Sequence, residues 1–351
     1  MGKVSLKQLA AALDVSVSTV CKSLKGSYEI SDDTKQRVIE MAQNMGYNPN
    51  PYAGSLRHHK SKTIAIIIPE ITNNFFIQAI SGAETVAHLN DYHLLIYVTN
   101  DDVLKEKSIL RDLQNGRVDG VIMSLSGTTN TYNHIDELIE TGVPVVFFDR
   151  ICHEIETAKI TTDDFESGFK ATEHLIQSGC RDIAYLSISE SLSIDNKRMQ
   201  GYMEALNKYQ IHFNNERILR CDNDEKSNYE KIKILLEGSI VPGGIFASVE
   251  RLALTTYYVC DELNLVIPDD VKVISFSNLQ TAPLLSPSLT TITQPAYEMG
   301  NQAATILFRH LAKKRPQVSN EAIVIPSSLV IGNSTNPRLS KLNDAGLQWH
   351  Q

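Results

Sequence analysis

The sequence predicts a small all-α domain at the N-terminus, followed by an α/β domain of two lobes with doubly wound parallel sheets. Three observations support this prediction. Apolar residues in the first fifty positions repeat with helical spacing between turn residues. Short apolar runs then alternate with amphipathic segments, as in parallel sheets covered by helices on both faces. At about 150 residues per domain, a chain of 351 residues also corresponds to two or three domains.

The first two helix patterns are separated by a tight turn. Apolar residues repeat at i, i+3, i+4 and i+7 over residues 6–13, and Ser5 is positioned to cap this helix. Ser16 is a second N-cap, and the next helix is expected from Val17 to about Leu24, with Val20 and Leu24 inward. Its outward residues are then Ser18, Thr19 and Lys22. A helix, a short turn and a second helix form the helix-turn-helix geometry.

A third helix pattern follows Gly26, which is expected to end the second helix. It opens at Ser31 with acidic residues in its first turn, where they stabilise the helix dipole. Gly46 ends it. The predicted buried stripe is Val38, Ile39, Ala42 and Met45. By pattern alone, a generic three-helix bundle is an equal alternative to the helix-turn-helix.

The charge of the chain is unevenly distributed. The whole sequence has a formal net charge of -8. In residues 1–62, nine Lys and Arg face five Asp and Glu, which gives +4, and the remaining residues carry -12. A basic head on an acidic body indicates that the head alone meets a polyanion.

Beyond residue 62 the chain alternates apolar runs with helix patterns. About nine strands in one sheet would be unusual, so two lobes are predicted, with crossings at Ile160–Asp163 and Thr290–Pro295. Such folds bind ligands in a cleft at the carboxyl ends of the strands. The predicted strands are 63–69, 93–98, 120–124, 144–149, 183–187, 244–247 and 271–276. The predicted helices include 75–89, 105–113, 165–177, 195–209 and 251–263.

Several classes of protein are disfavoured. The five cysteines are scattered and include no CxxC, which favours a reducing compartment. The chain opens without a signal-peptide pattern, and its apolar runs are too short to cross a bilayer, so a cytoplasmic protein without membrane contact is expected. HExxH, P-loop, GxGxxG and GxSxG motifs are absent, so we expect no metal, no cofactor and no enzyme activity. A sugar-binding receptor and an α/β enzyme with a helical appendage remain the alternatives.

Residues 4–57 read VSLKQLAAALDVSVSTVCKSLKGSYEISDDTKQRVIEMAQNMGYNPNPYAGSLR. This stretch resembles the DNA-binding head of the LacI family of bacterial transcription regulators almost residue for residue. The family's Val-Ser-x-x-Thr-Val lies at residues 15–20, its Val/Ile-Ser-x-x-Thr at 30–34, and its Gly-Tyr-x-Pro-Asn at 46–50. The resemblance implies a head that reads operator DNA in the major groove.

The resemblance also implies which residues meet DNA. The implied base-reading residues are Val17, Ser18 and Lys22, and the implied phosphate-holding residues are Ser16, Thr19, Ser31 and Thr34. Leu6, Lys25, Tyr47, Asn50, Ala53 and Leu56 complete the implied DNA-binding set. Two residues depart from the family pattern: Lys22 replaces an Arg and lacks its planar fork, and Lys25 replaces a common Asn.

Residues 50–57 correspond to the family's hinge, which becomes a helix only on the operator. Two hinges pair there in the minor groove, and a leucine wedges between base pairs. Leu56 matches that position. Gly54 stands where the family often has Arg and lowers helix propensity by up to about 1 kcal/mol relative to Ala. We therefore expect hinge folding to be weaker, or more dependent on DNA, than is usual in the family.

The resemblance continues to about residue 337. VFFDR, DNKRMQGYMEAL, IPDDVKVISFSN and LTTITQPAYEMG resemble the periplasmic-binding-protein-like effector domain of the same family. CKSLKGSYEIS, PEITNNFF and SFSNLQ are most similar to members from Bacteroides-type bacteria. The implied domains are 1–48 (helix-turn-helix), 49–61 (hinge), 62–337 (effector binding and dimerisation) and 338–351 (tail). The implied N-lobe is about 62–161 and 293–325, and the C-lobe about 162–292 and 326–337.

Eight residues are implied to bind the effector: Phe75, Phe76, Asp149, Arg150, Arg198, Glu250, Ser277 and Asn278. Each also has a structural interpretation, such as a local ion pair for Asp149 with Arg150 or core packing for the two phenylalanines. Glu250 falls on the Asp of the family's Asn-Asp, and Val249 replaces the Asn, so a standard sugar contact is altered.

The resemblance implies a transcription regulator, most simply a repressor of carbohydrate-utilisation genes. A homodimer would place two heads on a pseudo-palindromic operator in double-stranded DNA, and a small effector between the lobes, a sugar or sugar derivative, would change operator affinity. Residues 339–347 are too short and too broken by glycine for a tetramer-forming coiled coil, so a dimer is expected.

Overall fold

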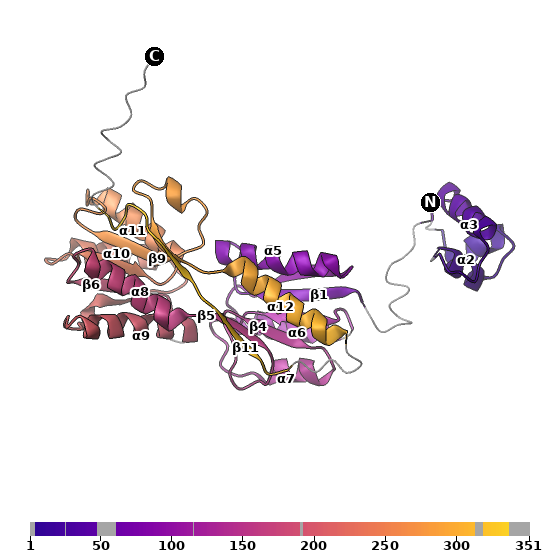
Figure 1. Ribbon diagram of the computed structural model, residues 1–351, viewed down its shortest axis with the longest axis horizontal. Helices are drawn as coiled ribbons and strands as arrows, with labels where there is room; N and C mark the ends of the chain where they lie inside the picture. The colour runs from indigo at the N-terminus through magenta and orange to yellow at the C-terminus, as the bar shows by residue number, and fades with distance from the viewer. Residues whose placement is uncertain are drawn as a thin grey trace, which may run out of the picture. The chain divides into compact units, whose positions relative to one another are not determined.

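The computed structural model describes residues 4–24, 26–47, 61–114, 116–189, 192–312 and 319–336 (Figure 1). The chain divides into two compact units, Met1–His59 and Lys60–Gln351, and each is described by itself. The predicted tail and nearly all of the predicted hinge lie outside the described residues. Four predicted DNA-binding residues lie outside them too: Lys25, Asn50, Ala53 and Leu56.

The first unit contains three helices, α1 (Leu6–Ala12), α2 (Val17–Leu24) and α3 (Asp32–Asn44). Ser5 and Gln8 form a capping box at the start of α1, which satisfies amide groups that the helix itself leaves unpaired. Gly26 and Gly46 follow α2 and α3 with φ of 67° and 65°, a conformation that favours glycine. The buried core is Leu9, Ala10, Val20, Val38 and Ala42.

One predicted core position of this unit is wrong. Ile39 is 41% exposed, because Val38 and Ala42 lie one turn apart and already fill the narrow stripe of α3 that faces α1 and α2. Leu24 and Met45, both predicted inward, are half-buried and pack against this core, and the small Ser23 is buried beside Leu24. Thr19, expected outward, is also half-buried.

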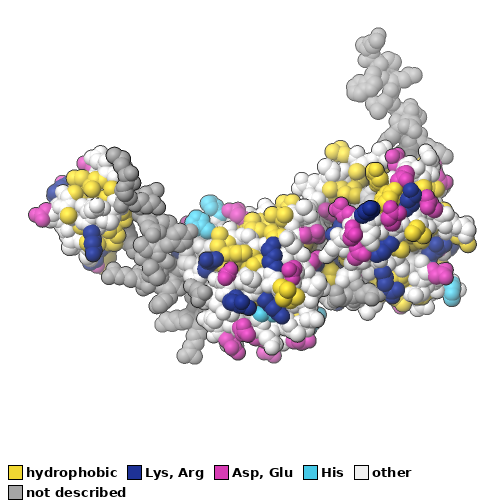
Figure 2. All heavy atoms as spheres, turned by 180° about the vertical axis from the view of Figure 1, so that it is seen from behind, with side chains coloured by type: hydrophobic (Ala, Val, Ile, Leu, Met, Phe, Trp, Pro, Cys, Tyr) yellow, Lys and Arg dark blue, Asp and Glu magenta, His cyan; other side chains and the backbone are white. Residues whose placement is uncertain are grey.

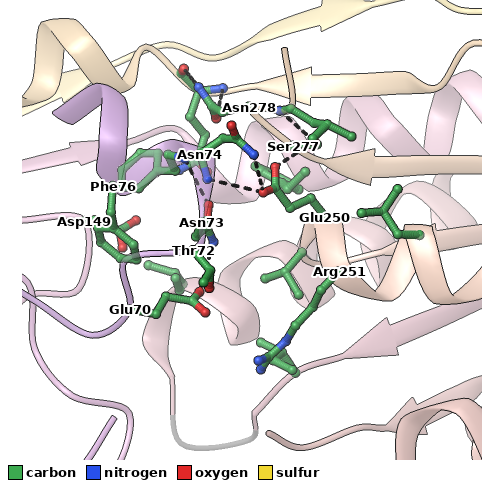
Figure 3. Close-up of a pocket in the computed structure, with 18 of the residues that line it drawn as sticks. Glu70, Thr72, Asn73, Asn74, Phe76, Asp149, Glu250, Arg251, Ser277 and Asn278 are labelled. Carbon is green, nitrogen blue, oxygen red and sulfur yellow. Dashed lines mark hydrogen bonds between the residues drawn. The ribbon is translucent and has the colours of Figure 1, made fainter. Parts of the chain in front are cut away.

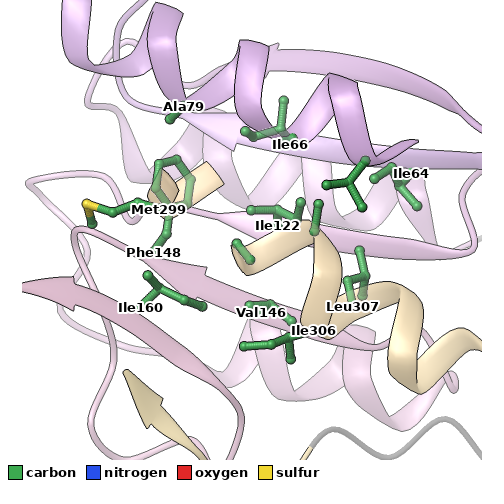
Figure 4. Close-up of a cluster of buried hydrophobic side chains, with 14 of the residues drawn as sticks. Ile64, Ile66, Ala79, Ile122, Val146, Phe148, Ile160, Met299, Ile306 and Leu307 are labelled. Carbon is green, nitrogen blue, oxygen red and sulfur yellow. The ribbon is translucent and has the colours of Figure 1, made fainter. Parts of the chain in front are cut away.

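The first sheet of the second unit has the order β11-β5-β4-β3-β1-β2, and all its neighbouring strands are parallel. Its strands are β1 (Thr63–Ile68), β2 (His93–Val98), β3 (Gly120–Met123), β4 (Val145–Phe148), β5 (Lys159–Thr162) and β11 (Ala322–Ile325). Helices α5 (Asn74–Leu89) and α12 (Ala296–Leu311) cover one face, where Figure 4 shows the buried cluster. Helices α6 (Val103–Leu113) and α7 (Asn133–Glu140) cover the other. This layer structure is called the N-lobe below.

The second sheet has the order β12-β10-β9-β8-β6-β7 and, with its helices, forms the C-lobe. Its strands are β6 (Ile183–Ser187), β7 (Ile218–Arg220), β8 (Gly244–Ala247), β9 (Lys272–Phe276), β10 (Thr290–Thr293) and β12 (Ser328–Val330). Helices α8 (Asp164–Gln177) and α9 (Ser193–Lys208) cover one face. Helices α10 (Glu225–Glu237) and α11 (Glu250–Glu262) cover the other. Two 3-10 turns, Asn215–Arg217 and Ala282–Leu284, complete the lobe.

The chain passes between the lobes after β5, after β10 and between β11 and β12 (Figure 1). The predicted crossing segments are therefore mostly strands: Lys159–Thr162 is β5 and Thr290–Thr293 is β10. The two sheets are parallel as predicted, except that β12 is antiparallel to β10. Strand β11 is parallel to β5, so the chain leaves the N-lobe at the carboxyl ends of its strands and enters the C-lobe at the carboxyl ends of the C-lobe strands. Strand β12 therefore runs antiparallel to β10.

Glycines allow close contact between helices in both lobes. A Cβ atom on Gly300 of α12 would lie 1.9 Å from the carbonyl oxygen of Ala79 in α5. A Cβ atom on Gly201 of α9 would lie 2.2 Å from the carbonyl oxygen of Phe165 in α8. These helix pairs are packed backbone against backbone, and the second pair fixes the position of Arg198 in the cleft wall.

The surface of the second unit carries mixed charge. On the face shown in Figure 2, hydrophobic, basic and acidic side chains lie interspersed over both lobes. Among the described residues, no helix combines the length and the apolar character needed to cross a bilayer.

Candidate functional site

The outward face of α2 is the first candidate site. Val17 is 40% exposed, and Ser18 and Lys22 are also exposed. These three residues were predicted to read bases, and the structure leaves all of them accessible on one short helix. The Nζ atom of Lys22 donates to Oε2 of Glu29, in the loop before α3. Sequence reasoning missed Glu29, because nothing in the spacing brings it to α2.

The four predicted phosphate-holding residues form two matching pairs. Ser16 Oγ accepts the amide of Thr19 at 3.0 Å, and the two hydroxyl oxygens lie 2.9 Å apart. Ser31 Oγ likewise accepts the amide of Thr34 at 3.4 Å, again with the hydroxyl oxygens 2.9 Å apart. Both pairs cap a helix start, so a phosphate there would share or replace a capping bond.

Leu6 and Tyr47 were predicted to contact DNA. The structure places both half-buried against the core of the head. Burial raises the pKa of the Tyr47 phenol. Only the exposed parts of the Leu6 and Tyr47 side chains could therefore contact DNA, because the rest of each side chain packs against the core of the head.

The second candidate site is a cavity of about 350 Å³ between the lobes (Figure 3). All eight residues that the resemblance implied for effector binding lie in its wall. Asp149 follows β4 and Ser277 follows β9, so the carboxyl ends of strands in both sheets meet here. Whether these residues bind a ligand stays a prediction.

Asp149 is buried in this wall, with a φ of 59° that places it in the left-handed region. Burial raises the pKa of its carboxyl group to about 6, although the nearby charges of Arg150 and Arg198 oppose the rise. Arg150 Nη1 donates to Asp101, and Arg150 Nε has no hydrogen-bond partner among the described residues. The Asp149–Arg150 ion pair is long, at 4.0 Å, so a local ion pair does not satisfy both groups.

Arg198 is fixed in place by three contacts. Its Nε donates to Asp164 at 2.8 Å, its Nη1 donates to the carbonyl oxygen of Ser248 at 2.8 Å, and its guanidinium carbon lies 3.8 Å from the ring centre of Phe276. Arg198 is only 3% exposed. Burial raises the pKa of Asp164, and the attraction of Arg198 opposes the rise. This buried pair forms part of the cleft wall. Two of the Arg198 nitrogens, Nε and Nη1, already donate to protein oxygens, so fewer donors are left for a ligand.

Glu250 joins the two lobes. Its Oε1 accepts the Asn74 amide at 3.3 Å and Asn74 Nδ2 at 3.0 Å, and its Oε2 accepts the Ser277 hydroxyl at 3.0 Å (Figure 3). Glu250 is the first residue of α11, and it faces the start of α5 in the other lobe. A carboxylate at a helix N-terminus is favoured by the helix dipole.

A second contact between the lobes lies beside it. Gln78 Nε2 donates to the carbonyl oxygen of Asn278 at 3.1 Å, and Asn278 Nδ2 donates back to Gln78 Oε1 at 3.2 Å. Asn278 Nδ2 also donates to the carbonyl oxygen of Gln294 at 2.7 Å. Gln78 and Asn278 therefore hold the lobes together at the cleft.

Phe75 and Phe76 are 5% and 2% exposed, so they serve the core as well as the cavity wall. Their rings pack edge to face with centres 5.1 Å apart, and both contact Phe148 at the end of β4. Phe75 and Phe76 therefore pack in the core of the N-lobe and also line the cavity, and their contact with a ligand stays a prediction.

Sequence reasoning missed other wall residues. Glu70, Asn73 and Asn74 lie between the end of β1 and the first turn of α5, and Gln294 follows β10. The strand-end rule could have found them, because a polar residue follows each strand within two positions. Among the described residues, His, Cys, Asp and Glu side chains form no cluster suited to holding a metal ion.

Two family models match this chain. Residues 5–50 match the model described as "Bacterial regulatory proteins, lacI family", and residues 172–335 match a "Periplasmic binding protein-like domain". The first covers the three-helix unit and the second covers most of the C-lobe with its final strand.

Known proteins match over almost the whole length. The HTH-type transcriptional regulator RegA of Clostridium saccharobutylicum is 31% identical over 333 residues, which are 94% of this chain and 99% of that protein. The Lac repressor dimer bound to operator and an anti-inducer matches in structure with a TM-score of 0.80 at 21% identity, covering 95% of this chain and 99% of that one. A regulator of the same family from Enterococcus faecium, solved with bound ribose, has a TM-score of 0.69 at 26% identity, covering 78% and 99%.

Proposed function

The chain belongs to the LacI family of bacterial regulatory proteins, and we propose that it represses carbohydrate-utilisation genes under the control of a neutral, hydroxyl-rich effector. Like its relatives, it is a DNA-binding transcriptional regulator and not an enzyme. Acting on bacterial operators, it works in the cytoplasm. The observation that supports the effector class is the composition of the cleft between the lobes.

The head supports operator reading through α2. Its three exposed residues offer one ammonium group, one hydroxyl and one apolar contact to base edges, and Lys22 can donate to guanine O6 and N7. In vitro selection of binding sites by the full-length chain should yield a pseudo-palindrome, and Lys22→Ala should flatten its preference at one position of each half-site. Equal preference in both proteins would remove Lys22 from base reading.

The cleft favours hydroxyl groups over phosphate. Its wall includes four carboxylates, from Glu70, Asp149, Glu225 and Glu250. Its three guanidinium groups are already engaged by protein oxygens, as Arg150 is with Asp101 and Arg198 with Asp164. A phosphate would therefore meet several negative charges and few free cationic donors.

Unpaired polar atoms match a hydroxyl ligand. Arg150 Nε and Gln294 Nε2 are buried donors that have no hydrogen-bond partner among the described residues, and Asp149 presents a carboxylate acceptor in the same wall. A sugar hydroxyl both donates and accepts, so it can satisfy both kinds of group. The cavity of about 350 Å³ falls in the range for small ligands. The ribose bound by the Enterococcus faecium relative belongs to this chemical class.

A thermal-shift screen of the full-length chain tests this proposal. Neutral sugars should raise the unfolding temperature, and the corresponding sugar phosphates and nucleosides should raise it less. The sugar that binds should change operator affinity, and by linkage operator DNA should change sugar affinity by the same factor. The neutral-effector proposal would be contradicted by a sugar phosphate that binds more tightly than its parent sugar. Loss of that binding in Asp149→Asn would show that the sugar phosphate occupies the cleft.

A homodimer is supported by the edge of the N-lobe sheet. Strand β2 is the last strand of this sheet, and it exposes Leu95 and Ile96 at 37% and 45%. An exposed apolar edge strand favours pairing with another chain. Sedimentation should show a dimer, and the double variant Leu95→Glu with Ile96→Glu should be a monomer with weak operator binding. A double variant that remains a dimer would move the interface elsewhere.

A further inference from the structure

A second cavity, of about 270 Å³, lies on the N-lobe away from the cleft and shares none of its wall residues. Its wall includes Lys107 and Arg111, one turn apart on α6. Asn133, His134 and Glu137 of α7 face them, with Thr131 just before that helix. No part of the proposed operator or effector binding uses this cavity.

His134 is a buried histidine with one ring nitrogen unpaired. It is 8% exposed, and its Nδ1 atom has no hydrogen-bond partner among the described residues. Its Nε2 lies 2.8 Å from Oε1 of Glu106, a carboxylate with no exposed surface. That carboxylate also accepts the Ser126 amide at 2.8 Å and the Thr129 hydroxyl at 2.9 Å. Because Glu106 only accepts, Nε2 carries a hydrogen that holds the ring against Glu106, and the unpaired Nδ1 is an acceptor with almost no accessible surface.

The start of α7 has unpaired donor potential. Its N-cap residue, Tyr132, makes no side-chain capping bond, and its carbonyl oxygen accepts the amides of Ile135 and Asp136, so the amides of Asn133 and His134 are the ones without a partner inside the helix. Helix N-termini of this kind attract anions through their N–H groups and their dipole. Asn133 and His134 are the first two residues of α7, so these amides begin at the cavity wall.

The charges around the cavity favour an anion by a small margin. Lys107 and Arg111 contribute two positive charges to the wall and Glu137 contributes one negative charge, while Glu106 is buried outside the wall. Lysine, arginine and helix amides together form a donor set that proteins use for phosphate. A neutral ligand would leave both cationic side chains without a partner in the site.

We propose that the cavity between α6 and α7 is a second ligand site, which binds a small phosphate-bearing anion. Lys107 and Arg111 would contact the phosphate oxygens from one side, and the first amides of α7 from the other. Glu137 limits the affinity and favours anions that reach past it to both cationic groups. The site is independent of the proposed effector cleft, which is rich in carboxylates.

Calorimetric titration of the full-length chain with inorganic phosphate, at ionic strength held constant with potassium chloride, tests the proposal. Saturable binding is expected for the wild type. The double variant Lys107→Gln with Arg111→Gln should bind about tenfold more weakly, because it removes two charge-assisted bonds. Glu137→Gln should bind a few-fold more tightly. Lys105→Gln is the matched control, because Lys105 lies on the same helix and outside the cavity wall.

A second arm compares a hexose phosphate with the same hexose without phosphate. Tighter binding of the ester than of inorganic phosphate, lost in the double variant, would identify a phosphorylated metabolite as the ligand. Binding of inorganic phosphate alone would identify the free ion. The proposal is overturned if wild type shows no saturable phosphate binding, or if the double variant binds as wild type and Lys105→Gln do. Asp149→Asn should leave phosphate binding unchanged, which separates this site from the cleft.

Discussion

Lys22 and Glu29 form an ion pair on the outward side of the head, and each side chain is 47% exposed. Lys22 comes from the helix proposed to read bases, and Glu29 from the loop that precedes α3. The Glu29 carboxylate fixes the orientation of the flexible Lys22 side chain. An arginine at this position would need less help, because its guanidinium group is planar and rigid. It also places a negative charge near the phosphates, which weakens non-specific attraction.

Glu29→Gln should therefore strengthen non-specific DNA binding and weaken discrimination. Non-specific affinity is expected to rise by about threefold to tenfold, and the slope of log K against log salt should steepen by about 1, because Lys22 becomes free for a phosphate. Fluorescence anisotropy with selected and scrambled DNA at several salt concentrations measures both. Glu40→Gln makes the same charge change on α3, and an equal loss of discrimination there would assign the effect to net charge alone.

Glu250→Ala should loosen the contact between the lobes. The variant removes the acceptor of the Asn74 amide and of the Ser277 hydroxyl, so hydrogen exchange at the start of α5 should accelerate. Mass spectrometry of exchanged peptides follows this directly. Glu237→Ala removes an exposed acid at the end of α10 and should leave that peptide unchanged. Unchanged exchange in both variants would mean that Gln78 and Asn278 hold the lobes without Glu250.

Arg198→Met should destabilise the second unit strongly. Asp164 is buried beside it and would lose its charged partner, a change that costs about 3 to 5 kcal/mol in comparable cases. Urea denaturation measures the loss. Lys208→Met, at the exposed end of the same helix, breaks an ion pair with Glu173 and should cost far less. Adding Asp164→Leu to Arg198→Met should recover part of the stability, since it removes the unpaired charge.

Asp149→Asn should make the ligand-free protein more stable at neutral pH. The folded carboxyl has a pKa of about 6, above the ordinary aspartate pKa of 3.8 that applies in the unfolded chain, so between these values the folded state binds more protons than the unfolded state. The favourable contribution of this group is therefore complete below pH 3.8 and is lost as the pH rises through 6. The variant should exceed wild type by up to about 3 kcal/mol at pH 7.5 and match it near pH 4.

Asparagine suits this test because it tolerates the left-handed backbone that Asp149 adopts. Urea denaturation of wild type and variant at several pH values gives the difference directly. A constant difference across this range would show that the Asp149 carboxyl does not titrate there.

Helical periodicity predicted the existence of the three head helices well, and the burial of single residues less well. Ile39 and Val38 are adjacent in α3 and both apolar, so spacing alone cannot decide which one faces the core. The decision depends on how much surface α1 and α2 offer to α3. The area of this contact is set by the packing of the three helices, and the periodic pattern of one helix does not contain it.

In the second unit, continuous apolar runs such as β1 were readily predicted, because all six of its residues are buried. The strands β5, β10 and β12 contain threonine, lysine or serine and lie near the sheet edge, so they do not give such a pattern. The cleft wall followed from strand ends and from the family resemblance. Asn74 and Gln78 were missed because their partners lie about 180 to 200 residues away in the chain, and only the folded lobes bring them together.

The crossing from β11 to β12 has a consequence for synthesis. The three-helix head needs only residues up to Tyr47 and can form its core soon after leaving the ribosome. The two lobes cannot do so in turn, because β11 completes one sheet at 322–325 and β12 completes the other at 328–330. Both sheets thus gain their last strands within nine residues, and a nascent chain would carry a finished head long before either half of its sensor is complete.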